Sequence, residues 1–177
     1  DEQPGKAKID RIPELRPAFA KDGSVTAANS SSISDGGAAL VLTSAAKAAS
    51  LGLTARARIV GHATFAQEPG WFTTAPVGAV KGLFERIGWS VDDVDLFEVN
   101  EAFAVVAMAA MQDLNIPHEK LNIRGGACAL GHPVGASSAR ILVTLLHALE
   151  DLGAKRGVAT LCIGGGEATA VAIEIDA

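Results

Sequence analysis

The sequence has 177 residues, of which 49% are hydrophobic and 20% are charged, enough for one domain with a substantial core. The net charge of −5 gives no reason to expect nucleic acid or an anionic membrane surface as a partner. Two cysteines do not make a disulfide scaffold, no cysteine–histidine grouping has zinc spacing, and no apolar run approaches the ~20 residues of a membrane helix.

The first part of the chain has the composition of an extended arm. Residues 1–24 are polar, with scattered charges, and are interrupted by Pro4, Pro13 and Pro17. Residues 25–37 are rich in Ser, Asn, Ala and Gly, which is typical of loops and turns. We therefore expect this region to lean on another structure and not to form a core of its own.

A short ordered stretch follows the arm. Residues 38–43 are predicted to form a short buried strand, and Ser44 is a suitable N-cap for a helix that runs to about Leu51. Gly52 should end that helix. We assign residues 1–52 to the arm and the incomplete end of a first domain.

Residues 53–177 show a regular alternation of element types. Their order, β-α-β-α-β-α-β-β, predicts a layered α/β domain. Strands are expected at 57–65, 94–99, 121–123, 158–163 and 169–175, and helices at 76–87, closed by Gly88, at 101–114, and at 136–149, stopped by Gly153.

The helix predicted at 136–149 has apolar residues over most of its circumference, which indicates burial on nearly all sides. One sheet covers only one side of a helix. We therefore expect a second sheet, contributed by a part of a larger molecule that this chain lacks.

Three segments carry residues that can take part in a reaction, and these residues lie at the end of a predicted strand or on a turn. Asn100 follows one strand, His132 lies on a glycine-rich turn before the buried helix, and Cys162 precedes the three glycines at 164–166. Ligands of open α/β sheets bind outside the carboxyl ends of the strands. If the segments converge, an amide, an imidazole, a thiol and backbone N–H groups meet, a set that suits acyl chemistry on a carbonyl.

Each of these residues also has a purely structural interpretation. His132 could be a hydrogen-bonded turn residue, Cys162 an inert buried thiol and Asn100 the N-cap of the next helix. The glycines at 164–166 could form only a hairpin turn. The other histidines, at 62, 118 and 147, have no polar or glycine-rich surroundings and are assigned no role.

Several motifs in order along the chain resemble the C-terminal half of the thiolases, and the resemblance covers almost the whole sequence. The motifs are Leu-Arg-Pro-Ala-Phe at 15–19, Gly-Ser-Val-Thr-Ala-Ala-Asn at 23–29, Asp-Gly at 35–36, Asn-Glu-Ala-Phe-Ala at 100–104, the glycine–histidine segment at 125–137, and Cys-Ile-Gly-Gly-Gly at 162–166.

The resemblance implies the thiolase fold and an acyltransferase that carries out the reversible Claisen condensation of two acetyl-CoA molecules to acetoacetyl-CoA and CoA. It implies that His132 activates a nucleophilic cysteine and donates to the substrate thioester oxygen, and that Asn100 completes this oxyanion hole. Cys162 would move the proton at the α-carbon of the second acetyl-CoA. The backbone N–H of Gly164 would donate in a second oxyanion hole.

The resemblance also implies the substrate-side residues. Ser31 would contact the pantetheine of coenzyme A, and Phe103 would line the same tunnel. Phe72 stands where the family often has Met, and its larger ring would shorten an acyl pocket. Other departures are Ser32, Glu167 and Cys128, which bear on chain-length preference and not on the catalytic matches. The coenzyme A thioester is the substrate, and no further cofactor is implied.

The thiolase nucleophile motif is absent from the sequence, so we expect the acyl-accepting cysteine on an N-terminal half that this chain lacks. A homo-oligomer, dimer or tetramer, and a cytoplasmic location with an organelle as the alternative are also expected. The alternatives are a longer-chain 3-ketoacyl-CoA thiolase, a decarboxylating ketoacyl synthase and a noncatalytic coenzyme A-binding module. Cys162 argues against the synthase, which has no second catalytic cysteine at this turn.

Overall fold

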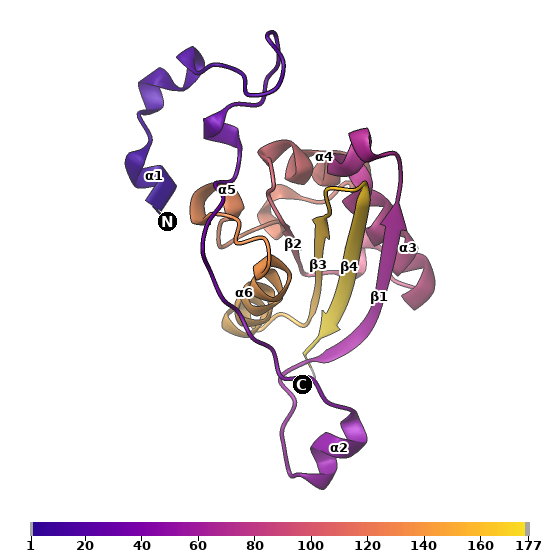
Figure 1. Cartoon of the computed structure of the whole chain (residues 1–177). Coiled ribbons are helices and arrows are strands. Elements are labelled where there is room, and N and C mark those ends of the chain that lie inside the picture. Colours follow the sequence, from indigo (N-terminus) through magenta and orange to yellow (C-terminus); the bar gives the residue numbers. More distant parts are fainter. Residues whose placement is uncertain (1, 176–177) are drawn as a thin grey trace.

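The computed structural model describes residues 2–175. Residue 1 of the expected arm and residues 176–177 of the expected α/β domain lie outside the described residues. An extended arm leads into a layered α/β unit, and the arm stands away from the sheet over much of its length (Figure 1). Among residues 2–175 no helix is long and apolar enough to cross a membrane.

The elements follow in alternating order along the chain. The helices are α1 (Glu2–Lys6), α2 (Ala45–Ser50), α3 (Ala75–Ile87), α4 (Ala104–Leu114), α5 (Ala127–Leu130) and α6 (Ser137–Leu152). The strands are β1 (Arg58–Ala66), β2 (Leu96–Val99), β3 (Arg156–Cys162) and β4 (Glu167–Glu174). Short 3-10 turns are η1 (Ile9–Glu14), η2 (Ala27–Asn29), η3 (Pro69–Thr74), η4 (Val91–Asp93) and η5 (His118–Lys120).

The strands form one mixed sheet in the order β1-β4-β3-β2. β2 and β3 are parallel, whereas β4 is antiparallel to both β3 and β1. Because β2 and β3 run in the same direction, their carboxyl ends meet at one edge of the sheet. This edge carries two of the predicted site residues.

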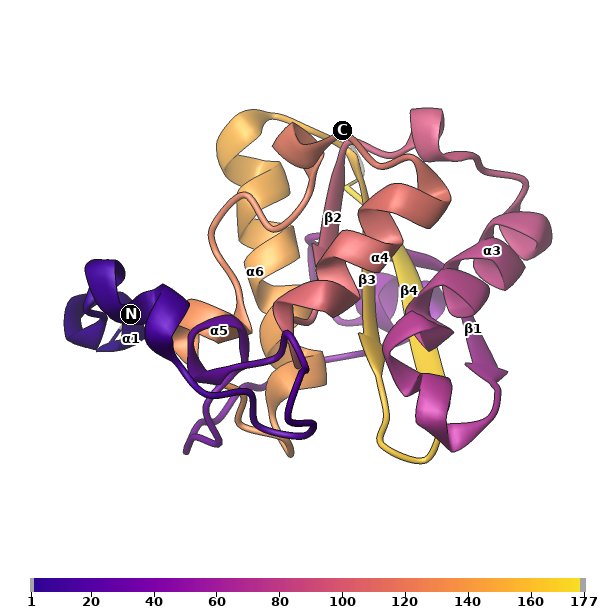
Figure 2. The same cartoon turned by 90° about the horizontal axis from the view of Figure 1, so that it is seen from above.

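Helices cover both faces of the sheet, with α3 and α4 on one side and α6 on the other (Figure 2). β3 alternates accordingly: Val158 and Cys162 pack in the cluster with α3 and α4, and Ala159 and Leu161 pack in the cluster with α6. A strand buried on both faces explains the continuous apolar sequence of this segment. The predicted layered α/β fold is confirmed.

The predicted helix ends are largely confirmed. α3 ends at Gly88 and α6 at Gly153, both in the left-handed conformation, and the Ser44 hydroxyl accepts a hydrogen bond from the Lys47 N–H at the start of α2. α4 begins at Ala104 rather than at 101, and its N-cap is Phe103. The interpretation of Asn100 as a helix N-cap is therefore wrong.

Two predicted strands differ in the structure. Residues 38–43 form no strand, and Val41 and Leu42 are exposed, because no described strand pairs with this segment. The segment 121–123 is reduced to a single bridge between Leu121 and Phe97. Apolar composition alone predicted both strands, and a strand also needs a neighbouring strand to bond.

Within residues 2–175, α6 is buried on one side only, as expected for a chain without the second sheet. Ile141, Leu145 and Leu149 are buried against the sheet, whereas His147 and Leu152 are exposed. The described residues provide only one sheet for this helix. The second sheet stays a prediction.

Candidate active site

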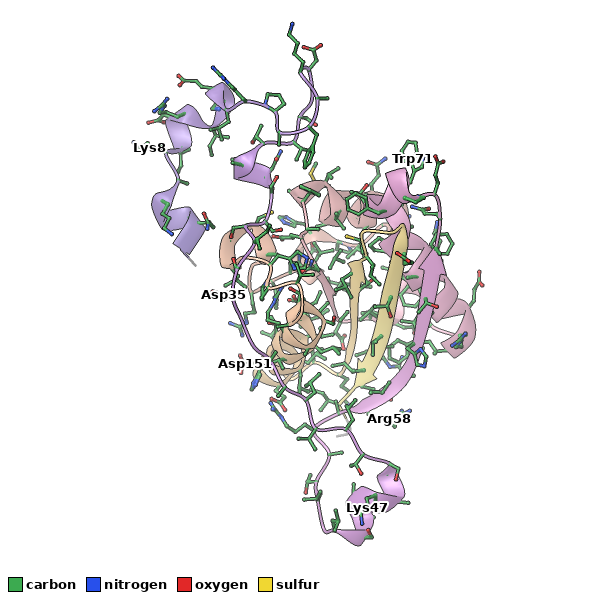
Figure 3. All side chains as sticks on the ribbon, viewed as in Figure 1. Lys8, Asp35, Lys47, Arg58, Trp71 and Asp151 are labelled. Atoms are coloured by element: carbon green, nitrogen blue, oxygen red, sulfur yellow. The ribbon has the colours of Figure 1, made fainter. Side chains whose placement is uncertain are left out.

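The candidate site lies at the edge where β2 and β3 end. Asn100 directly follows β2, and its N–H donates to the Thr160 carbonyl of β3 at 3.0 Å. Cys162, two residues beyond Thr160, is the last residue of β3. Side chains crowd between the sheet and α6, whereas those of the arm, such as Lys8, and of α2, such as Lys47, project away from these layers (Figure 3).

His132 is held in one orientation by the first residue of α6. Its Nδ1 lies 2.6 Å from the Ser137 hydroxyl, which in turn donates to the Pro133 carbonyl at 3.1 Å. Because the one hydroxyl proton is used there, Ser137 must accept from an Nδ1–H. Nε2 is then the unprotonated nitrogen, and it lies 3.5 Å from the Asn100 Nδ2. This tautomer makes Nε2 available as a base.

The turn that carries His132 is fixed by the arm. The His132 N–H donates to the Ser32 carbonyl at 2.8 Å. The preceding Gly131 has φ +94°, and a Cβ there would overlap the Ser34 hydroxyl. Only glycine combines this conformation with such close approach. The glycine-rich sequence therefore serves to bring the arm and the histidine together.

Burial lowers the pKa of His132, and the Arg140 charge lowers it further. The imidazole therefore stays neutral at pH values where an ordinary histidine, with a pKa of 6.5, would begin to protonate. Asn100 is buried, and its Oδ1 has no hydrogen-bond partner within residues 2–175. An amide that faces the imidazole and retains acceptor capacity can help to hold a polar substrate group.

Cys162 and Gly164 lie at the same edge of the sheet. Cys162 is buried, and burial raises the pKa of its thiol, so it keeps its proton at neutral pH. The turn after it is a hairpin closed by an Ile163 N–H to Glu167 carbonyl bond of 2.7 Å. Gly164 is exposed in this turn, and its N–H has no protein partner among the described residues. Within the same residues no hydrogen bond links Cys162 to His132.

The predicted substrate-side residues lie together around the loop after Asn100. Ser31 bonds the Ala102 carbonyl through its N–H, at 3.2 Å, and through its hydroxyl, at 2.9 Å. The Phe103 ring meets Phe72 edge-on at a centroid distance of 6.3 Å. Phe19, to which we assigned no role, meets Phe103 at 5.6 Å in the same way. Three aromatic rings from three segments thus border the site.

A second loop contact connects the Asn100 loop with the glycine-rich turn. The Glu101 carboxylate accepts from the Asn122 side chain at 3.0 Å and from the Cys128 N–H at 3.1 Å. A Cβ on Gly126 would overlap this carboxylate. Burial, with Glu101 nearby, raises the pKa of Cys128 to about 11, so this thiol is a poor nucleophile.

Sequence reasoning missed a buried charge pair behind the site. Glu98 is 2% exposed, and its carboxylate lies 3.8 Å from Nη1 of Arg140 on α6. Burial raises the pKa of Glu98 to about 7, although the Arg140 charge opposes that rise. A carboxylate inside the apolar segment 96–99 was a visible signal. Its partner could not be identified without the packing of α6 on β2.

Known proteins match this chain over nearly its whole length. The family described as "Thiolase, C-terminal domain" matches residues 53–175, and "Thiolase, N-terminal domain" matches residues 1–46. The chain belongs to the thiolase family. The sequence resemblance is carried by three segments: the loop after β2, the His132 turn and the hairpin after β3. They lie at one edge of the thiolase sheet.

The relatives of this thiolase chain are similar in sequence and in structure. It is 49% identical to a "Probable acetyl-CoA acetyltransferase" of Dictyostelium discoideum, over 98% of the chain and 42% of the relative. It is 51% identical to the "Acetyl-CoA acetyltransferase" of Chromobacterium violaceum, over 95% of the chain and 43% of the relative. The chain thus spans less than half the length of these curated relatives.

Solved structures agree with the fold. The acetyl-CoA acetyltransferase of Bacillus anthracis superimposes with a TM-score of 0.91 at 44% identity, over 94% of the chain and 42% of that structure. Human mitochondrial 3-ketoacyl-CoA thiolase in complex with CoA gives 0.89 at 39% identity, over 97% of the chain and 43% of that structure. The chain is thus similar both to an acetyl-CoA acetyltransferase and to a 3-ketoacyl-CoA thiolase.

Proposed function

We propose that the thiolase containing this chain condenses two acetyl-CoA molecules to acetoacetyl-CoA and CoA, and catalyses the reverse cleavage. The observation that carries the proposal is the fixed His132 imidazole, whose basic Nε2 faces Asn100 at the carboxyl ends of β2 and β3. The relatives named acetyl-CoA acetyltransferase support the same reaction.

In the first half-reaction, His132 acts as the base. Its Nε2 takes the proton of the nucleophilic thiol, which lies on the N-terminal half of the enzyme. The sulfur bonds to the acetyl carbonyl carbon, the bond to coenzyme A breaks, and the departing thiolate recovers the proton from His132. A base with a lowered pKa stays unprotonated at neutral pH and can begin this cycle.

In the second half-reaction, Cys162 acts on the α-carbon. Its thiol first passes its proton to the neutral His132, and the resulting thiolate removes a methyl proton from a second acetyl-CoA. The carbanion then takes the acetyl group from the nucleophilic sulfur, and that sulfur recovers its proton from His132. Asn100 Nδ2–H and protonated His132 are donors for the thioester oxygen, and the Gly164 N–H is a donor for the acyl carbonyl. A raised pKa suits Cys162, because its thiolate is then a stronger base for a weak carbon acid.

The surroundings suit a coenzyme A thioester, and the proposal includes no further cofactor. Phe19, Phe72 and Phe103 offer an apolar border near Ser31. A cleft of about 560 Å³ lies between the arm and α5, and its lining includes the cations Lys6, Lys8 and Arg11, which suit phosphate groups. We further propose a cytoplasmic homo-oligomer, a dimer or tetramer, completed by an N-terminal half.

The test is thiolytic cleavage of 3-ketoacyl-CoA substrates by the enzyme in which this chain is joined to an N-terminal thiolase half. Acetoacetyl-CoA should be cleaved with a higher kcat/KM than 3-ketoacyl-CoA of six or more carbons. A reversed preference would identify a longer-chain thiolase, and condensation that requires malonyl-CoA would identify a ketoacyl synthase. Coenzyme A binding without turnover would reduce the site to a binding module.

A further inference from the structure

The contact between α6 and β2 contains a buried charge where an apolar contact would be expected. Every second residue in this segment, Leu96, Glu98 and Asn100, lies on the same face of β2. This is the face that α6 covers. Arg140 reaches this face from the first turn of α6, with its side chain 19% exposed. Its Nε and Nη1 have no hydrogen-bond partner within residues 2–175.

The position of Arg140 is unfavourable for the stability of the fold. A buried ion pair gains less than well-packed apolar side chains would, and the first turn of a helix repels a cation. Burial accordingly lowers the pKa of Arg140. The same turn begins with Ser137, whose hydroxyl holds Nδ1 of His132. The charge therefore lies one turn behind the group that orients the proposed base.

We propose that Arg140 is a positioning residue for the reaction: its buried charge repels a proton from His132 and so keeps Nε2 available as a base. The inference rests on the proposed function, because only a reaction that begins with neutral imidazole benefits from this repulsion. Glu98 holds the guanidinium in place across the helix–sheet contact.

The other titratable groups around His132 do not replace Arg140. The segments that contact or adjoin the His132 turn carry Glu98 on β2, Glu101 in the loop after it, Cys128 on α5 and Asp35 on the arm, and Cys162 ends the neighbouring strand β3. All of these groups become negative or stay neutral, so Arg140 is the cation of the group. Burial raises the pKa of Glu98 to about 7, so Glu98 is mostly protonated in the more acidic range where His132 titrates.

The experiment follows the titration of each histidine by hydrogen–deuterium exchange at the imidazole C2 carbon, read peptide by peptide by mass spectrometry. It is carried out on the 177-residue chain and on the complete enzyme. Arg140→Gln should move the His132 titration to higher pH, whereas Glu98→Gln should leave it nearly unchanged. Arg124→Gln, at an exposed ion pair with Asp151, is the matched control, and the exposed His118 is the internal reference.

The double variant Glu98→Gln/Arg140→Gln replaces the ion pair with two neutral amides and decides the question if Arg140→Gln alone does not fold. It should also raise the His132 titration relative to Glu98→Gln. No shift in either Arg140 variant, or an equal shift in Glu98→Gln, would overturn the inference. In the complete enzyme, Arg140→Gln should move the acidic limb of kcat/KM to higher pH in step with the titration. An altered titration without thiolase turnover would instead refute the proposed function alone.

Discussion

The contact between α6 and the sheet has two halves of opposite character. In one half, Ile141, Leu145 and Leu149 pack on apolar residues of β2, β3 and β4 and are almost completely buried. In the other half, nearer the start of α6, Arg140 and the Ser137–His132 pair face Glu98 and Asn100. One helix thus contributes both to the core and to the candidate active site.

The difference between the halves separates stability from function. The apolar half gains free energy from buried area. The polar half leaves two Arg140 nitrogens and the Asn100 Oδ1 without protein partners among the described residues, and each such group costs roughly 1–3 kcal/mol. Proteins retain such costs mainly where activity needs them. Substitutions in the two halves should therefore have opposite signatures.

The largest effect is expected in the apolar half, for Leu145→Ala. Leu145 is fully buried and packs directly on Gly157 of β3, so truncation leaves a cavity that cannot collapse. We expect a loss of about 2–5 kcal/mol in the free energy of unfolding, measured by denaturant titration. Leu152→Ala, at an exposed position of the same helix, should cost less than about 0.5 kcal/mol. Equal costs would show that α6 is not packed as described.

In the polar half, His132→Asn should reduce kcat of the complete enzyme in both half-reactions by about 10²–10³, with a much smaller effect on stability. In the proposed mechanism one imidazole serves the nucleophile and the substrate oxygen, so both steps need it. Steady-state kinetics with acetoacetyl-CoA and His118→Asn as the exposed control would measure this. If only condensation slowed, the role in nucleophile activation would be wrong.

Glu98→Gln should change the pH dependence of stability. The pKa of Glu98 is raised from its ordinary value of 4.5 to about 7, so ionisation destabilises the fold. The wild type should therefore lose stability relative to the variant as the pH rises from 4.5 to 7, by on the order of 3 kcal/mol. The two proteins should be similar in stability below pH 4.5. Parallel stability curves, with Glu119→Gln as the exposed control, would contradict this assignment.

The smallest effect concerns the aromatic border of the site. Phe72→Met should raise, by about 10–200-fold, the ratio of kcat/KM for a substrate one or two methylenes longer to kcat/KM for acetoacetyl-CoA. This is the discrimination that one methylene gives in an apolar pocket. Competition between acetoacetyl-CoA and a six-carbon 3-ketoacyl-CoA would measure the ratio. Trp71→Met, at the exposed neighbouring ring, is the control. An unchanged ratio would remove Phe72 from the acyl pocket.

The sequence predicted the layered fold because periodicity and glycine stops are local signals, as at Gly88 and Gly153. It identified Asn100 and His132 as candidates for one site, because Asn100 follows a predicted strand and His132 lies on a glycine-rich turn, but it left their convergence as a condition. It could not show that Ser137 fixes the imidazole or that Arg140 reaches Glu98, since both contacts depend on how α6 packs on β2. The segment 38–43 illustrates the reverse error, because an apolar run does not reveal whether a partner strand is present.

The central claim, that Cys162 serves only the second half-reaction whereas His132 serves both, is tested most directly with Cys162→Ser in the complete enzyme. Exchange of labelled coenzyme A into acetyl-CoA reports the first half-reaction, and acetoacetyl-CoA formation reports the whole. A serine hydroxyl is far too weak an acid to move the proton at neutral pH. We expect condensation to fall by at least about 10² while exchange stays within a few-fold of wild type, and Cys128→Ser to affect neither. Equal loss of both activities, or condensation that survives in Cys162→Ser, would contradict the account.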